Sequence, residues 1–147
     1  MKTILNLFLL IGLSIMLSSS AVEAQDAMKP KKFDNPQWKN VILIDYKPGM
    51  MNKARDLIRN YHAKASEIAG TPGPETLMIL ESGEYDMMAI WGMSGGISDM
   101  DWDISPNNIK WRKAMNELAG GADEALKIMQ QYSSCINRTT NYLARID

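Results

Sequence analysis

Three short segments of the chain are apolar on both of the faces that a β-strand presents. The segment VILIDY (Val41–Tyr46) alternates Val and Leu with two isoleucines, and Glu75–Ser82 and Tyr85–Met93 show the same pattern. Successive side chains of a strand point to opposite sides, so a sheet built from these segments is apolar on both sides. Such a sheet must be covered twice, and this requirement limits the folds open to the chain.

Helical segments alternate with these strands. Apolar residues recur in steps of three and four over Met50–Ala69, and again in two segments, 106–119 and 123–136, that are separated by a pair of glycines. These steps predict one helix after the first strand and two after the third. Thr139–Ile146 predicts a closing strand. The order is typical of a ferredoxin-like α+β fold, βαββαβ, with one antiparallel sheet and its helices on one face.

The helices of such a fold cover only one face of the sheet. The other face would be an unusually large exposed apolar patch for a monomer. Burying apolar area contributes about 25 cal/mol per Å², which favours association strongly over several hundred Å². A second copy packed sheet to sheet across a two-fold axis would cover this face. The sequence therefore predicts a homodimer.

The first 24 residues have the layout of a secretory signal peptide. Lys2 precedes the apolar run Ile4–Leu17, and the tripeptide VEA then offers a cleavage site before Gln25. The run is shorter than the roughly 20 residues that a membrane span needs. We therefore expect a signal peptide (1–24), a polar linker (25–40) and one folded domain (41–147). The mature protein is expected to be secreted or periplasmic, with no membrane association after cleavage.

Three sequence segments resemble the dimeric α+β barrel superfamily: the opening VILIDY-KPG-helix, the hairpin ETLMILESGEYDMMAIWGM and the closing TTNYLARI. The resemblance covers about Val41–Asp147. The group includes antibiotic-biosynthesis-monooxygenase-like, stress-responsive barrel and NIPSNAP-like proteins. It implies a ferredoxin-like subunit with functions that range from cofactor-free oxygenation, haem degradation and isomerisation to binding alone. The segment GGISDMDWDISPNNIKW is similar to one in secreted bacterial proteins that have no assigned activity. Fold alone does not choose among these functions.

Acidic residues stand at the ends of the apolar strands: Asp45, Glu81 and Asp86. If the face that Asp45 shares with Val41 and Leu43 lines a dry cavity, desolvation raises the carboxyl pKa there. Such a group can act as a general base or acid. The alternative is a strand-end acid that lies in solvent or pairs with a Lys or Arg, which is the commoner situation.

His62 is the only histidine of the chain, and it borders the apolar face of the first predicted helix. Its unperturbed pKa lies near neutrality, which suits a base or a ligand to haem or a metal if the ring faces a cavity. The alternative is a half-exposed position at the edge of the helix. His62 and Asp45 are therefore the candidate catalytic residues.

Neither a metal site nor a cofactor is expected. A single His and a single Cys do not supply the ligands of a zinc site. The acids at Asp99, Asp101 and Asp103 begin like an EF-hand loop, but Ile104 and Lys110 stand where that loop requires Gly and Glu. The formal charge of −1, with acids and bases interspersed, provides no basic patch for nucleic acid.

Aromatic and Met side chains can line an adaptable apolar pocket. We expect Trp102, within the acidic loop, to fold back as a plug. The alternative is an ordinary core with a Met-rich dimer interface. The candidate ligand-binding residues are Tyr46, Glu81, Asp86, Trp91, Trp102 and Trp111.

The function predicted from these features is binding of a small apolar or aromatic molecule between sheet and helices, because many ligand pockets combine an apolar lining with a few polar groups. One alternative is a cofactor-free monooxygenase or isomerase, which needs His62 or an acid such as Asp45 in the cavity. A second alternative is a structural module whose interior is fully packed.

Overall fold

The computed structural model describes residues 29–147, and the folded unit within it spans Asn35–Asp147. The predicted signal peptide lies outside the described residues. The elements follow the order β1 (Gln37–Tyr46), α3 (Met51–Leu57), η1 (Ile58–His62), α4 (Ala63–Ala69), β2 (Thr76–Ile79), β3 (Met87–Gly92), η2 (Gly96–Asp101), α5 (Pro106–Ala119), α6 (Ala122–Cys135) and β4 (Ile136–Ile146).

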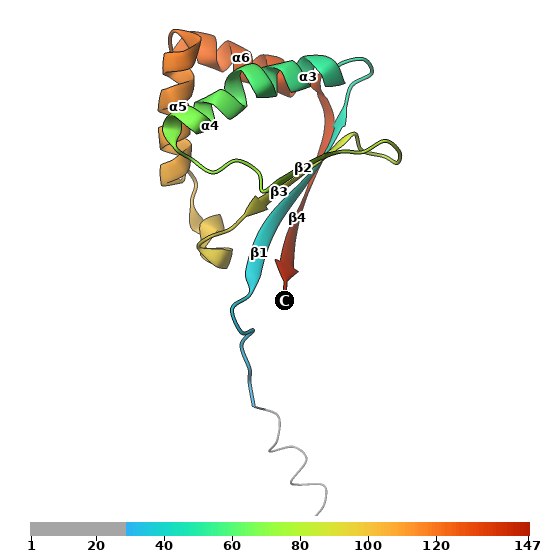
Figure 1. Ribbon diagram of the computed structural model, residues 1–147, viewed down its shortest axis with the longest axis vertical. Helices are drawn as coiled ribbons and strands as arrows, with labels where there is room; N and C mark the ends of the chain where they lie inside the picture. Colours follow the sequence, from blue (N-terminus) through green and yellow to red (C-terminus); the bar gives the residue numbers. More distant parts are fainter. Residues whose placement is uncertain (1–28) are drawn as a thin grey trace, which may run out of the picture. The chain divides into compact units, whose positions relative to one another are not determined.

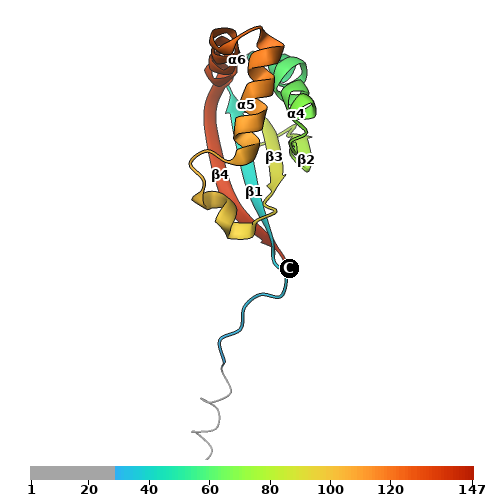
Figure 2. The same ribbon diagram turned by 90° about the vertical axis from the view of Figure 1, so that its left-hand side faces the viewer.

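The four strands form one antiparallel sheet in the order β2-β3-β1-β4. The long strand β1 is central, and Ile42 pairs with Ala89 of β3 on one side and with Asn141 of β4 on the other. Helices α3 to α6 all lie over the same face of the sheet (Figures 1 and 2). The predicted ferredoxin-like α+β fold is therefore confirmed. We call the face under the helices the inner face and the opposite one the outer face.

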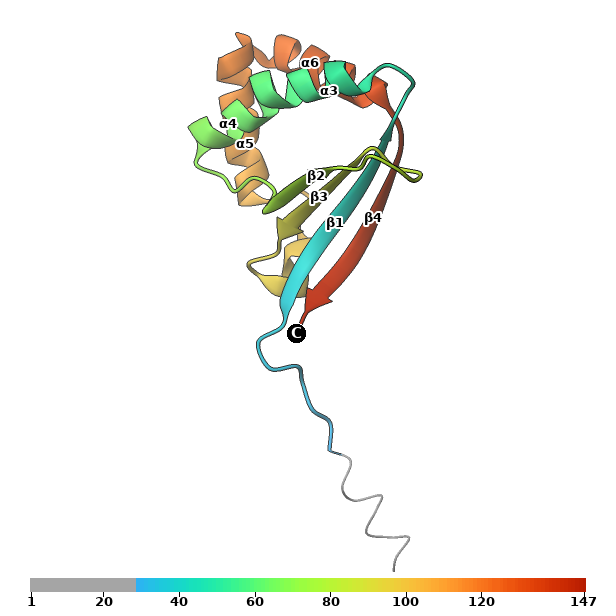
Figure 3. The same cartoon turned by 45° about the vertical axis from the view of Figure 1, so that its right-hand side comes forward.

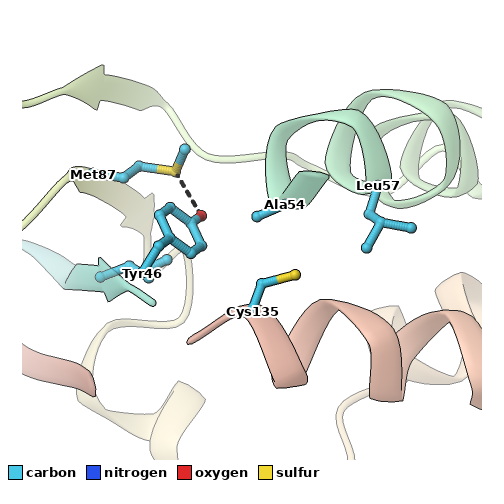
Figure 4. Close-up of a cluster of buried hydrophobic side chains, with 6 residues drawn as sticks. Tyr46, Ala54, Leu57, Met87 and Cys135 are labelled. Carbon is cyan, nitrogen blue, oxygen red and sulfur yellow. Dashed lines mark hydrogen bonds between the residues drawn. The ribbon is translucent and has the colours of Figure 1, made fainter. Parts of the chain in front are cut away.

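The inner face carries the core. Ile44 and Tyr46 of β1 and Met87 of β3 are buried against Ala54 and Leu57 of α3. Figure 4 shows this cluster, in which Cys135 at the end of α6 closes the side toward β4. The lone thiol is thus buried. A second cluster, made by Ala65, Ala114, Met115 and Ala125, joins helices α4, α5 and α6 to one another.

Strand β1 begins at Gln37, four residues before the expected start at Val41. Residues 37–40 are strand because all four pair with β4, and Lys39 and Asn40 also pair with β3: Lys39 lies opposite Gly92 of β3 and Ala144 of β4. Lys39 also forms an ion pair with Glu75, with its Nζ 2.6 Å from Oε2. Backbone pairing outweighs polar composition here, which the residue types alone could not reveal.

The helix predicted over Met50–Ala69 is interrupted in its middle by η1, a single turn of π-helix. A π-turn inserts an extra residue, so the apolar stripe is displaced beyond it. Ala65 remains buried, whereas Ile68, which regular helical spacing places on the same face, is 56% exposed. Figure 3 shows α3 and α4 as two successive segments above the sheet.

The last two helices begin and end close to the predicted residues, but the side chains that they bury differ in part from those predicted. Ser105 caps α5, and its Oγ accepts a hydrogen bond from the backbone N–H of Asn108 at 3.2 Å. In α6, by contrast, Ala125 and Cys135 are buried while Leu126, placed on the buried side by the spacing, is 49% exposed. Among residues 29–147, no helix has the length and apolar character needed to cross a membrane.

Candidate functional site

A cavity of about 500 Å³ lies between the inner face of the sheet and the helices. Its size falls within the range of pockets that hold small organic ligands. The sheet supplies the floor with side chains of β1, β2 and β3, and η1, α4, α5, α6 and the loop after α4 supply the walls. The lining residues are Ile42, Ile44, Ile58, His62, Ala63, Ser66, Glu67, Thr71, Gly73, Pro74, Leu77, Met87, Ala89, Trp91, Trp111 and Tyr132.

Strand alternation determines which side chains form the floor. Ile42 and Ile44 point toward the helices, as do Met87, Ala89 and Trp91 on the neighbouring strand. Ala89 lies opposite Ile42, and its methyl group leaves open the space that a larger side chain would fill. The floor is therefore apolar and hollow at its centre.

His62 forms part of the wall and is the last residue of the π-turn. Its ring lies between two aromatic rings, with the centroid of Trp111 at 5.5 Å and that of Tyr132 at 4.8 Å. Its Nε2 atom is buried and has no hydrogen-bond partner in the described chain. Burial lowers the pKa of His62, because a low-dielectric environment disfavours the charged imidazolium. The imidazole is therefore neutral at pH 7.

The backbone carbonyl of His62 is held by two side chains. Trp111 donates its indole N–H to this oxygen at 3.1 Å, and Ser66 donates its hydroxyl at 3.2 Å. A π-turn changes the backbone hydrogen-bond pattern, so a carbonyl there is open to side-chain donors. These two bonds connect α5 and α4 to the turn that carries the imidazole, and they fix its position in the wall.

A pair of tyrosines lies next to the imidazole. The hydroxyl oxygens of Tyr46 and Tyr132 are 3.4 Å apart, and the Tyr46 hydroxyl also donates to the Met87 sulfur at 3.5 Å. Burial raises the pKa of both phenols, so both are protonated at neutral pH. Tyr132 contacts the His62 ring and therefore joins the buried tyrosine pair to the cavity wall.

The structure brings three of the predicted site residues together. His62, Trp91 and Trp111 all line the cavity. Tyr46 lies behind the wall, within reach of Tyr132, and its backbone N–H donates to Oδ2 of Asp86 at 2.7 Å. Asp86 thus fixes the end of β1, which is a structural contact.

The other three lie away from the cavity. Asp45 alternates with the buried Ile44 and therefore belongs to the outer face, where it accepts a hydrogen bond from Asn137 Nδ2 at 2.6 Å. Glu81 follows β2 and is exposed. The expectation that Trp102 folds back as a plug is wrong: its side chain is 56% exposed, because η2 ends at Asp101 and the chain then extends into solvent.

Several wall residues were not singled out by the sequence: Tyr132, Ser66, Glu67 and Thr71. Tyr132 was placed on the apolar side of its helix, but nothing in that spacing distinguishes a cavity wall from a packed core. The polar residues lie around the end of α4, where Gly70 adopts a left-handed conformation (φ +59°) and turns the chain back over the sheet. The sequence identifies Gly70 as a residue that ends a helix, but it does not show that the chain beyond Gly70 lies over the sheet.

No cluster of three or more His, Cys, Asp or Glu side chains suited to a metal ion occurs in residues 29–147.

Comparison with known proteins gives structural neighbours only. No protein-family model matches the chain, and no curated protein matches it by sequence. The chain is similar in structure to a NIPSNAP family protein from Agrobacterium tumefaciens, at 16% identity and a TM-score of 0.48, over 75% of this chain and 91% of that one. A second NIPSNAP family protein of unknown function from the same bacterium gives 12% identity and a TM-score of 0.49, over 75% and 87%.

Proposed function

We propose that this protein binds a small apolar or aromatic molecule in the cavity between its sheet and its helices. The observation that carries the proposal is the position of His62, whose buried Nε2 lacks a partner in the wall of an apolar cavity of about 500 Å³. Buried polar groups are normally paired, and an unpaired one costs about 1–3 kcal/mol. A ligand that repacks the wall and offers a polar atom to the imidazole removes this cost.

The composition of the wall supports the same class of ligand. Its aromatic members, Trp91, Trp111 and Tyr132, offer flat surfaces, and Met87 is a flexible neighbour. Apolar walls contribute affinity in proportion to the ligand area that they bury. The few polar groups then orient the ligand.

We further propose that the functional unit is a secreted or periplasmic homodimer. The outer face carries apolar side chains such as Val41, Leu43 and Ile90, and it also carries Met78 and Tyr142, which are 38% and 52% exposed. Helices α3 to α6 all lie over the opposite face, so none of these helices covers the outer face (Figure 2). Packing against the same face of a second copy would bury these side chains.

Thermal shift assays on the mature chain test the ligand proposal. A panel of naphthalene, 2-naphthol, indole and decanol should contain at least one stabiliser of the wild type, because a ligand that binds only the native state raises its melting temperature. A89F fills the floor of the cavity and should abolish that shift. A122F adds the same ring at an exposed position of α6 and should retain it. A panel that leaves the wild type unchanged would contradict the proposal.

One observation favours a second candidate function, a cofactor-free monooxygenase or isomerase. The imidazole of His62 is neutral at pH 7 because burial lowers its pKa, and a neutral imidazole beside a bound molecule can accept a proton. Asp45 lies on the outer face and takes no part. Exchange of an acidic ligand C–H for deuterium, followed by NMR with wild type and H62Q, tests this function; exchange that persists in H62Q excludes His62 as the base.

A further inference from the structure

A second hollow of about 310 Å³ adjoins the cavity. The two share three wall residues, Ile58, Leu77 and Met87. The second hollow lies between β2 and the segment α3–η1, where Arg55 and Arg59 contribute to its wall. The apolar space therefore continues from the His62 wall to a pair of guanidinium groups at the surface.

Charges of opposite sign are found in the two hollows. Glu67 is the single carboxylate among the described residues that line the large cavity, whereas the smaller hollow is lined by two arginines. Arg59 and Glu67 are eight residues apart, which corresponds to about 12 Å along a helix at 1.5 Å per residue. A ligand that spans both hollows therefore meets positive charge at one end and negative charge at the other.

The two arginines are available to a ligand. Arg59 forms an exposed ion pair with Asp56, with Nη2 2.7 Å from Oδ1, and exposed pairs of this kind are weak. The Arg55 side chain is exposed and has no carboxylate partner in the described chain. Guanidinium groups bind carboxylates through two parallel hydrogen bonds, so a pair of them at the mouth of an apolar channel suits an anionic head group.

Resting on the proposed binding function, we propose that the ligand is an anionic amphiphile, an apolar chain or ring system that carries a carboxylate. Its head lies at Arg55 and Arg59, and its body passes Ile58 and Leu77 into the cavity beside His62. Glu67 sets the orientation, because it repels an anionic head at the opposite end. The ligand class is thereby narrowed from apolar molecules in general to those with one negatively charged end.

Titration of the mature protein with decanoate, decanol and decylamine tests this proposal, below the concentrations at which these compounds aggregate. Trp91 and Trp111 line the cavity, so their fluorescence reports occupancy. The wild type should bind decanoate at least 10-fold more tightly than decanol and than decylamine, because the two arginines attract only the anionic head group. The preference for decanoate should decrease with added salt, since screening weakens exposed charges.

Variants locate the head group. R55Q/R59Q should lose the preference for decanoate and keep the affinity for decanol. R112Q/K113Q removes the same charge from exposed positions of α5 and should behave as the wild type. A89F should weaken the binding of decanoate and decanol alike.

The outcomes separate the two proposals. Equal binding of decanoate and decanol to the wild type would overturn the proposal that the ligand is anionic. It would leave the proposed apolar binding site intact. The proposal of an anionic ligand would also be overturned if R55Q/R59Q kept the preference for decanoate, or if A89F kept the wild-type affinity for decanoate. Failure of all three compounds to bind would overturn this inference, and failure of naphthalene, 2-naphthol and indole as well would overturn the proposed function.

Discussion

The ring of His62 lies 4.8 Å from that of Tyr132, centroid to centroid, and this contact joins the π-turn of one helical segment to the last helix of the fold. Tyr132 in turn lies within 3.4 Å of the Tyr46 hydroxyl, at the end of the central strand. Three elements that are distant in sequence thus meet behind one wall of the cavity. The imidazole is desolvated because of this enclosure, and the pH dependence of the protein follows from it.

The first prediction concerns stability below neutral pH. Burial lowers the pKa of His62 in the folded state below its ordinary value of 6.5. As the pH falls through 6.5, the unfolded chain binds this proton first, so the free energy of unfolding decreases until the folded pKa is reached. Urea unfolding at pH 7.5 and pH 5.0 should show a larger decrease for the wild type than for H62Q. Equal decreases in the two proteins would show that His62 is not desolvated.

The second prediction concerns the bond that holds the π-turn. W111F removes the indole N–H that donates to the His62 carbonyl and should lower the free energy of unfolding by about 1 kcal/mol, the usual contribution of such a bond. W102F alters an exposed ring and should change it by less than about 0.5 kcal/mol. Urea unfolding monitored by circular dichroism measures both. An equal decrease in the free energy of unfolding of W102F would show that the hydrogen bond from Trp111 makes no specific contribution to stability.

The third prediction concerns assembly. The mature chain should sediment as a dimer, and Y142K should convert it to a monomer, because the substitution places a charge on the outer face of the sheet. L126K places the same charge at an exposed position of α6, over the opposite face, and should remain dimeric. Analytical ultracentrifugation distinguishes these states. A wild-type monomer at high concentration would contradict the proposed pairing.

The fourth prediction concerns processing. If the full chain is expressed in a bacterial host with a Sec pathway, the exported product should begin at Gln25, because VEA is the expected cleavage site. Intact-mass measurement of the periplasmic fraction gives the mature N-terminus. Replacing Ala24 by a bulky residue should block processing and retain the precursor mass. An unprocessed cytoplasmic product from the unaltered chain would refute the expected signal peptide.

The sequence was sufficient for the order of elements and for the class of fold, because apolar periodicity and helix-ending glycines are local signals. The N-cap residue Ser105 and the helix-ending Gly70 are local features of this kind. The π-turn at Ile58–His62 could not be predicted from the sequence, since an inserted residue leaves the composition unchanged while it rotates the helical turns that follow. That displacement is why Ile68 is exposed although its spacing placed it inside.

The site was predictable only in part. His62, Trp91 and Trp111 were selected for their chemistry, and the fold places all three in the cavity lining. Asp45 could not be assigned from alternation alone, because both faces of its strand are apolar and the pattern does not say which one the helices cover. That Glu67 lines the cavity could not be predicted, because this depends on how α4 lies above the sheet.

The central claim is that a small molecule occupies the cavity beside His62. The most direct measurement is the ¹H–¹⁵N spectrum of the single imidazole, recorded while the best ligand of the panel is added to the mature protein. The account predicts that the His62 ring signals shift in proportion to occupancy, and that A89F abolishes the shift. Saturable binding that leaves the His62 ring signals unchanged would place the ligand elsewhere and contradict the account.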